Sequence, residues 1–389
     1  MLSKNIILKN FQLKKIPIAK KKKLLNIFKK LHKEPSQIIS SMDNNYKDSY
    51  NKKIILNLKK INHVTLIGMG GSILGAKAIY KFLKPKLKKF SFVDNFSNIP
   101  LKENDKKKIT LVISKSGNTL ETISNANVLI KKNKTNIFIT DNKKSYLMSL
   151  AHKLKAQVIH HNNYIGGRYS VLSEVGMLPA QLMGFKPEKF RRLNQLMSNK
   201  NFINLLVQNV SNILTLSKKN KTNSIILNYD DRSNDLFSWY QQLVAESLGK
   251  KSTGILPIIS IMPRDNHSLM QYYLDGVKNH FFTFFFVREK NSRKIKNNEV
   301  LKSHFYLKDK SLNDISFSQF SSTEKVFKKK KIPFRSFVIQ NRSEEALGEL
   351  FTFFILETIL LGMAMNINPF DQPAVEQIKK ETTKILLKS

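Results

Sequence analysis

The chain has 389 residues, 41% of them hydrophobic, which is enough for two cores of about 150 to 200 residues each. It contains no cysteine, which excludes a disulfide-stabilised scaffold and predicts a cytoplasmic protein. The net charge of +39 would suit a nucleic-acid or anionic-membrane partner. However, only nine of the 67 basic residues are arginine and the lysines are scattered, so we attribute the charge to compositional bias.

The N-terminal half predicts a helical segment followed by an α/β domain. Residues 1–45 are basic and lack the continuous apolar stretch of a signal peptide. In residues 46–190, short apolar runs alternate with longer helical patterns, which is typical of a doubly wound parallel sheet. The predicted strands are His63–Gly68, Phe90–Asp94, Ile109–Ser114, Asn136–Thr140 and Gln157–His160.

The C-terminal half predicts a second unit of similar layout. Residues 191–222 form a predicted helical linker, residues 223–345 the second domain, and residues 346–389 a C-terminal helix and arm. An apolar helix is expected over Glu344–Ala364, but Glu357 interrupts it, so no membrane span is expected. The other elements expected here are strands Ser224–Asn228, His280–Val287 and Phe334–Gln340, and helix Asn234–Leu248. The expected fold class is therefore α/β, with two doubly wound parallel-sheet domains and a C-terminal helical arm.

A glycine-rich turn follows the first strand of the first domain, with the sequence GMGGSILG from Gly68 to Gly75. Glycines let the backbone approach an anion, and the following helix N-terminus offers free N–H groups. Position 73 is Ile, so the dinucleotide pattern G-x-G-x-x-G fails, and no P-loop Gly-Lys-Ser/Thr follows. Gly71 and Ser72 are candidate phosphate ligands, although such a turn alone is weak evidence.

A second turn, SKSGNTLET, again lies between a strand and a helix. It combines four hydroxyls and a lysine within nine residues, enough to satisfy several phosphate oxygens. Helix capping explains one or two of these residues, not the whole cluster. The two turns therefore predict one phosphate site at the carboxyl ends of the strands. The candidate ligands here are Ser114, Lys115, Ser116, Thr119 and Thr122.

Together the two turns resemble the sugar-isomerase (SIS) domain, and four further segments narrow the resemblance to the glucose-6-phosphate isomerase family. These segments are GGRYSVLS from Gly166, AESLGK from Ala245, DNHSLMQ from Asp265 and NPFDQPAVEQIK from Asn368. All six occur in the family's order, from residue 68 to residue 379. The resemblance implies that both domains are SIS-like and that the first binds the phosphate.

The resemblance also implies a reaction: reversible isomerisation of glucose 6-phosphate and fructose 6-phosphate through a cis-enediol(ate), without cofactor or metal. Glu246 would be the base that moves the proton between C1 and C2, and Arg168 the cation that stabilises the enediolate. His267 and Lys379 resemble the pair that opens the sugar ring. The other implied substrate-binding residues are Gly167 and Gln242.

Some observations on these residues are independent of the resemblance. Arg168 is the first arginine of the chain and lies in a glycine-flanked turn. This position indicates that the planar, permanently charged guanidinium is needed there. Without the motif, Glu246 would be taken for an ordinary solvated helix residue. The C-terminal motif carries Ala374 and Ile378 where the family usually has glycine, so the placement of Lys379 stays open.

Other functions remain to be weighed. An isomerase that also accepts mannose 6-phosphate would differ only in a few pocket contacts. A non-catalytic SIS-domain sensor would keep Ser114–Thr122 but need not keep the four catalytic candidates. A nucleic-acid-binding protein is suggested by charge alone, and His160–His161 lacks the acidic or cysteine partners of a metal site. We expect a homodimer with shared active sites, with no nucleic-acid or membrane partner.

Overall fold

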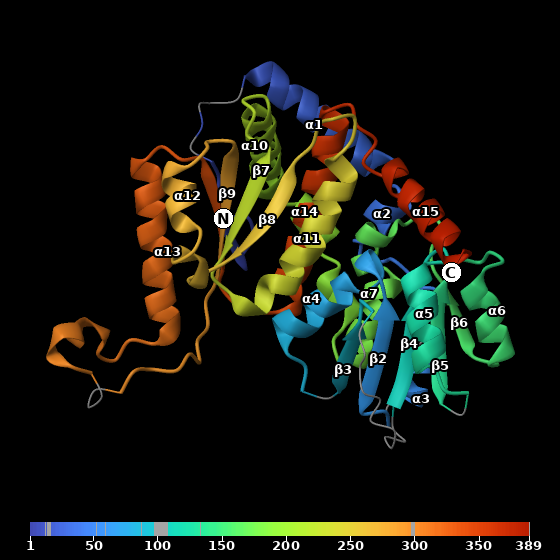
Figure 1. Ribbon diagram of the computed structural model, residues 1–389. Coiled ribbons are helices and arrows are strands. Elements are labelled where there is room, and N and C mark those ends of the chain that lie inside the picture. The colour runs from blue at the N-terminus through green and yellow to red at the C-terminus, as the bar shows by residue number, and fades with distance from the viewer. Residues whose placement is uncertain are drawn as a thin grey trace.

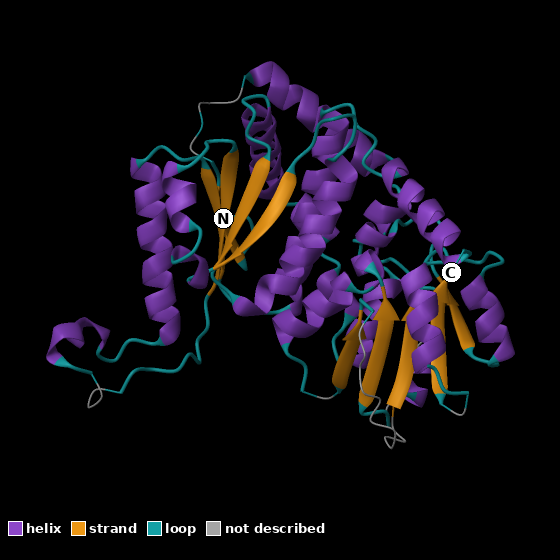
Figure 2. Ribbon diagram, viewed as in Figure 1, coloured by secondary structure: helices purple, strands orange, loops and turns teal. Residues whose placement is uncertain are grey.

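The computed structural model describes residues 1–388 except 12, 14–16, 52, 59, 87, 97–107, 133 and 297–299. Two five-stranded sheets are separated by a layer of helices (Figure 1, Figure 2). The N-terminus lies on one sheet, and the C-terminal helix reaches the other. The predicted α/β class with two sheet domains is confirmed, whereas the domain boundaries stay a prediction.

The first sheet is entirely parallel, with the strand order β3-β2-β4-β5-β6. Its central strands are almost continuously apolar and buried, as expected for a parallel sheet covered on both faces. All five strands agree with the prediction to within one residue. They are β2 (His63–Gly68), β3 (Lys89–Val93), β4 (Lys108–Ile113), β5 (Thr135–Thr140) and β6 (Gln157–His160).

The second sheet has the order β1-β10-β9-β7-β8, and all its strands except β1 are mutually parallel. Its strands are β1 (Ile6–Lys9), β7 (Asn223–Asn228), β8 (Leu256–Ile261), β9 (His280–Val287) and β10 (Phe334–Ile339). The predicted helical segment over residues 1–45 is therefore wrong at Ile6–Lys9, which pairs antiparallel with β10. Strand β8 is missing from the prediction, because Pro257 argues against a strand unless the strand lies at a sheet edge, as β8 does.

The helices around the two sheets include both long helices expected from the sequence, α11 (Asn234–Leu248) and α14 (Glu344–Ala364). In the first half of the chain they are α1 (Ile18–Lys33), α2 (Gln37–Ser40), α3 (Lys53–Asn57), α4 (Leu74–Leu83), α5 (Leu120–Leu129), α6 (Tyr146–Lys153) and α7 (Glu174–Leu182). The others are α8 (Pro187–Phe190), α9 (Leu193–Met197), α10 (Lys200–Ser217), α12 (Met270–Asp275), α13 (Leu312–Lys329) and α15 (Glu376–Leu386).

Helix α14 forms part of the core. By length and composition its 21 residues could cross a membrane, which differs from the expectation that Glu357 would prevent this. In the fold, 94% of its most apolar window is buried inside the protein. It packs against α8, α10 and α11. Its apolarity is therefore explained by burial among other elements of the same chain.

A buried ionic network fixes α14 to the second sheet. The carboxylate of Glu357 pairs with the guanidinium of Arg335 on β10, and both side chains are fully buried. The guanidinium also donates to Asn209 Oδ1 at 2.8 Å and to Thr283 Oγ1 at 3.0 Å. Tyr240 Oη on α11 donates to Glu357 Oε1 at 3.0 Å. Because every charge has partners, the network offsets the cost of burying it and joins α10, α11 and α14 to the sheet.

We expect Glu357→Ala to lower the free energy of unfolding by about 3–5 kcal/mol, because it leaves the Arg335 guanidinium buried without a counter-charge. Urea denaturation followed by far-UV circular dichroism measures the loss. The double variant Arg335→Met/Glu357→Leu should recover most of it, since it removes both charges together. A double variant as unstable as Glu357→Ala would show that lost packing, not an unpaired charge, is responsible.

Candidate active site

A cavity of about 570 Å³ opens at the carboxyl ends of the first sheet's strands. The chain runs from β2 to β3 on one side and then returns to β4 on the other, so the strand order reverses between β2 and β4. Open α/β sheets bind ligands at such a point. The lining residues are Met69, Gly71, Ser72, Ser114, Lys115, Ser116, Asn118, Thr119, Asp141, Lys143, Lys144, Gly166, Gly167, Arg168, Gln242, Glu246, Phe370, Gln372 and Lys379.

The glycine-rich turn forms a short 3₁₀ turn, η1 (Gly70–Ser72), in close contact with two other segments. A Cβ atom on Gly71 would lie 2.1 Å from the carbonyl carbon of Gly167 and 2.4 Å from the nitrogen of Arg168. Gly70 has a φ of +52°, and a Cβ there would lie 2.6 Å from Nε2 of Gln242 on α11. The glycines therefore allow the turn, the Gly167–Arg168 segment and α11 to meet at one point.

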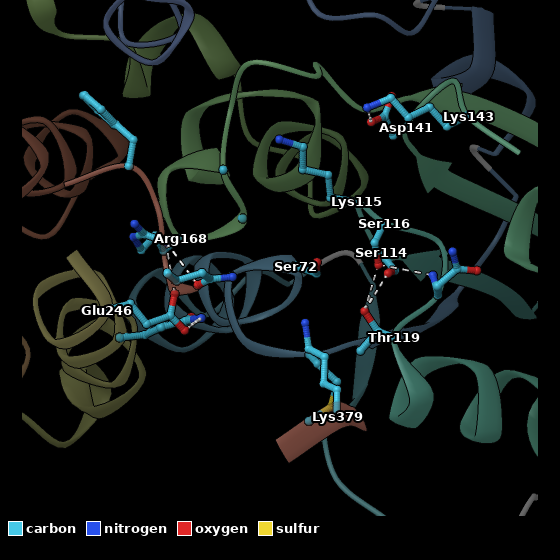
Figure 3. A pocket seen from close by; sticks show the side chains of 18 of the residues that line it. Ser72, Ser114, Lys115, Ser116, Thr119, Asp141, Lys143, Arg168, Glu246 and Lys379 are labelled. Carbon is cyan, nitrogen blue, oxygen red and sulfur yellow. Dashed lines mark hydrogen bonds and ion pairs between the residues drawn. The ribbon is translucent and has the colours of Figure 1, made fainter. Parts of the chain in front are cut away.

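The turn after β4 (residues 114–119), called the hydroxyl turn below, lines the side of the cavity away from Arg168 and Glu246 (Figure 3). Ser114 Oγ lies 2.9 Å from Thr119 Oγ1, and Ser116 Oγ lies 3.5 Å from the same atom. Thr119 is the N-cap residue of α5, so the free N–H groups of that helix start beside these hydroxyls. In Figure 3 they cluster together with Ser72, across the cavity from Arg168 and Glu246. This side has the donors that a phosphate requires.

Thr122 is not part of this cluster, although the sequence predicts it as a phosphate ligand. It lies within α5, its side chain is buried, and it does not line the cavity. The cluster gains other polar residues instead, because β5 ends beside β4 and delivers Asp141, Lys143 and Lys144 to the same edge. These three residues were not predicted, although they come directly after a predicted parallel strand, which is the position from which ligand-binding residues are expected.

Lys115 is held at the edge of the cavity. Its Nζ donates to the carbonyl oxygen of Asn163 at 2.7 Å. Burial lowers the pKa of Lys115, and the nearby Asp141 carboxylate opposes part of this shift. Asp141 also pairs with Lys143 at 3.4 Å. The basic residues here therefore outnumber the acidic ones, which favours an anionic ligand.

Arg168 lies at the other end of the cavity with its guanidinium fixed in place. It is only 4% exposed. Its Nε donates to Ser247 Oγ at 2.8 Å, and its Nη2 donates to the carbonyl oxygens of Pro369 and Asp371 at 2.7 and 3.0 Å. Tyr169 Oη contacts the same Ser247 hydroxyl and Pro369 carbonyl, at 2.8 and 2.9 Å. This leaves Nη1 as the part of the guanidinium that faces the other polar groups of the site.

Nη1 of Arg168 donates to Glu246 Oε2 at 3.4 Å and to Gln372 Oε1 at 3.2 Å. Glu246 lies in the last turn of α11, whose other face is buried in the core. Gln242, one turn earlier, donates from Nε2 to Glu246 Oε1 at 2.8 Å. Gln242 and Arg168 thus each bind one oxygen of the Glu246 carboxylate. The Glu246 side chain is still 29% exposed, so the carboxylate is open to the cavity.

Gln372 and Lys379 come from the C-terminal arm. Lys250 Nζ anchors the start of the arm through Asp371 Oδ1 at 2.5 Å, in addition to the two carbonyl bonds of Arg168. Helix α15 forms in spite of Ile378, whose side chain is 71% exposed, and Lys379 points into the cavity (Figure 3). Gln372 was missed as a site residue, although it lies within the quoted NPFDQP motif.

His267 does not line this cavity. It follows the short turn η4 (Arg264–Asn266) after β8 in the second domain and is exposed. Asp265 shapes the turn by accepting from Ile261 N at 2.7 Å and from Ser260 Oγ at 3.1 Å. The chain therefore brings together all the predicted site residues except His267 and Thr122. In the described part of the chain, no group of three or more acidic or histidine side chains is arranged to hold a metal ion.

Comparison with known proteins agrees with this arrangement. The family model for phosphoglucose isomerase matches residues 54–389. A glucose-6-phosphate isomerase of Methanocaldococcus jannaschii is 32% identical over 375 residues, which cover 89% of this chain and 91% of that protein. A glucose-6-phosphate isomerase of Mycoplasmopsis pulmonis is 32% identical over 360 residues, which cover 84% of this chain and 83% of the relative.

Two solved structures have the same fold at lower identity. A glucose-6-phosphate isomerase from Chlamydia trachomatis gives a TM-score of 0.75 at 19% identity, covering 98% of this chain and 88% of that one. A hypothetical protein from Thermus thermophilus gives 0.81 at 23% identity, with 95% and 94% covered. From the extent of the family match and the identity to its relatives, the chain belongs to the phosphoglucose isomerase family.

Proposed function

We propose that this protein is a cytoplasmic enzyme that interconverts D-glucose 6-phosphate and D-fructose 6-phosphate. The observation that carries the proposal is the carboxylate of Glu246, held by Gln242 and facing the Arg168 guanidinium, in the same cavity as the hydroxyl turn. A base beside a fixed cation suits proton transfer next to a carbonyl. A non-catalytic sensor would need the hydroxyl turn but neither of these groups.

The phosphate of the sugar would lie against the hydroxyl turn. Ser72, Ser114, Ser116 and Thr119 offer hydroxyl donors, and the free N–H groups at the start of α5 favour a dianion. Lys115 adds a cation at the edge of the cavity. All of these groups belong to the first domain. The phosphate would therefore be bound independently of the groups that move the proton.

The proton would be moved at the other end of the cavity. Glu246 would take the proton from C2 of the open-chain aldose and return it to C1, while the proton of the C2 hydroxyl moves to the C1 oxygen, giving the ketose. The developing negative charge on the enediolate oxygens would lie near Nη1 of Arg168. The guanidinium is already fixed by Ser247, Pro369 and Asp371, so little reorganisation is needed when charge develops.

Ring opening requires an acid–base pair at the ring oxygen and the C1 hydroxyl. Lys379 lines the cavity, whereas His267 is exposed outside it. We propose that the protein is a two-fold homodimer in which His267 of one subunit completes the cavity of the other. An isologous interface would give two equivalent composite sites.

We expect the purified protein to convert fructose 6-phosphate into glucose 6-phosphate, followed through a coupled dehydrogenase. EDTA should not change the rate, because Glu246 and Arg168 carry out the proposed step. Folded protein without turnover, or turnover abolished by the chelator, would refute the proposed function.

Glu246→Gln should lower kcat by about 10²-fold or more, because the amide cannot accept the C2 proton. The inhibition constant of D-sorbitol 6-phosphate, which has no carbonyl to isomerise, should stay within a few-fold. Proton exchange at C2 in deuterated water, measured by NMR, reports the step directly.

The converse control is Ser114→Ala combined with Thr119→Ala, which should weaken sorbitol 6-phosphate binding by about tenfold or more through lost phosphate hydrogen bonds. Ser318→Ala, at an exposed position of α13, should change neither quantity. Normal exchange in Glu246→Gln would remove Glu246 from the mechanism.

Complementation tests the shared site. Glu246→Gln and His267→Ala are each expected to be inactive, and both are unfolded and refolded together. If His267 acts across the interface, every mixed dimer has one intact site, and about a quarter of the wild-type activity should return with random pairing. If mixing restores nothing beyond the separately refolded variants, both residues serve one chain and the shared site is wrong.

A further inference from the structure

The four parallel strands of the second sheet have the same order as the first four strands of the first sheet. In the first sheet β2 lies between β3 and β4, and in the second β7 lies between β8 and β9. The second sheet therefore has its own reversal point, between β7 and β9, where an open α/β sheet would bind a ligand. In this protein, charged side chains occupy that point and contact a helix of the first domain.

The charged residues come from the carboxyl ends of three adjacent strands. Asp230 follows β7, Glu289 follows β9 and Arg342 follows β10. Arg342 donates to both carboxylate oxygens of Asp230, at 2.7 and 3.2 Å, and its Nε donates to Glu289 Oε1 at 2.6 Å. The side chains of Arg342 and Asp230 are only 8% and 10% exposed. A bidentate, nearly buried pair of this kind has a well-defined geometry.

These residues hold the C-terminal end of α4. The carbonyl oxygen of Phe82 accepts from Arg232 Nη2 at 2.6 Å and from Arg342 Nη1 at 3.4 Å, and Arg232 Nε reaches the carbonyl of Lys81 at 3.3 Å. The Arg342 guanidinium also lies over the Phe82 ring, 4.6 Å from its centroid. Carbonyls at a helix C-terminus lack intrahelical partners and carry partial negative charge, so two arginines are well suited to bind them.

We call the group formed by Arg232, Arg342, Asp230 and Glu289 the clamp. Helix α4 connects the clamp to the cavity. It begins at Leu74, two residues after Ser72, and its last carbonyls are bound by Arg232 and Arg342. It packs along α11 between the two sheets (Figure 1). The two helices are antiparallel. Gln242, near the end of α11, meets Gly70 just before α4, and Asp235 at the start of α11 lies 3.7 Å from Lys77 of α4. A shift of α4 along its axis would therefore change the position of Ser72 relative to Glu246.

We propose that Arg342 is a positioning residue, which fixes α4 against the second domain and thereby sets the distance from the phosphate site to Glu246. This inference rests on the proposed function. The hydrogen-bond partners of Arg342 described above are Asp230, Glu289 and Phe82, and none of them lines the cavity. It acts through α4, and Arg232 contributes to the same clamp. Phosphate binding needs only first-domain groups, whereas proton transfer needs the two domains in register.

The test compares kcat with ligand affinity in Arg342→Met. We expect kcat per folded molecule to fall by about 10²-fold, as for a misplacement of about 1 Å between reacting groups. The inhibition constant of D-sorbitol 6-phosphate should stay within a few-fold. Arg342→Lys should recover little, because an ammonium lacks the bidentate fork. Arg232→Met, at a more exposed position, guards against a folding failure and should lower kcat less, again without loss of affinity.

Arg288→Met is the matched control. Arg288 follows β9, the strand beside β10, and like Arg342 it lies over a phenylalanine ring, 4.6 Å from the centroid, but that ring belongs to Phe317 of α13 and not to α4. The Arg288→Met variant should therefore have the wild-type kcat. If kcat of Arg342→Met and Arg232→Met stays at the wild-type value, or if affinity falls as much as kcat, the positioning role is overturned. A wild-type enzyme without turnover would instead refute the proposed function, so the two failures are distinguishable.

Discussion

The antiparallel packing of α4 against α11 is the contact on which the site depends. Each helix follows the first of the parallel strands of its own sheet, β2 for α4 and β7 for α11, and the two helices meet where Gly70 closely approaches Gln242. This pairing joins the hydroxyl turn at the edge of one sheet to the Glu246 carboxylate, which lies on a helix that follows a strand of the other sheet. Without it, the hydroxyl turn and Glu246 would belong to separate domains with no common cavity. The glycines of η1 are required because any larger side chain would separate these backbones.

Arg168 links this contact to the C-terminal arm. Two of its guanidinium nitrogens bind Ser247 on α11 and the carbonyls of Pro369 and Asp371, and the third faces the cavity. The same side chain therefore holds in place the segment that supplies Gln372 and leads to Lys379. Loss of Arg168 would therefore remove a charge from the site and also release the arm. The two sheets also differ at the points where their strand order reverses. In the first sheet this point opens into the cavity, whereas in the second it is filled by Arg342 and the C-terminal end of α4.

Much of the fold and the site could be predicted from local sequence. The buried parallel strands are continuous apolar runs between turns, so all five strands of the first sheet could be predicted from the hydrophobic pattern. Gly71, Ser114 and Thr119 lie in the turns that follow such strands, and the turns after parallel strands lie at the same edge of the sheet. Helix α11 has an apolar stripe and is followed by Gly249, which is why the position of Glu246 on it could be predicted. The roles of these residues came from the family resemblance, not from pattern.

Only the tertiary structure decided how distant segments meet. Ile6–Lys9 is too short to be distinguished from basic helical sequence, and it becomes a strand because β10 offers an unpaired edge. Thr122 has the residue type of a phosphate ligand, but the turn of α5 buries its side chain away from the cavity. The approach of Arg168 to Pro369 and Asp371, about two hundred positions later, has no local signal because it depends on packing. The sequence by itself determined the parallel strands and which candidate site residues lie in the turns after them. The packing of helices between the two sheets decided which of them share a cavity, because that requires distances which no local periodicity encodes.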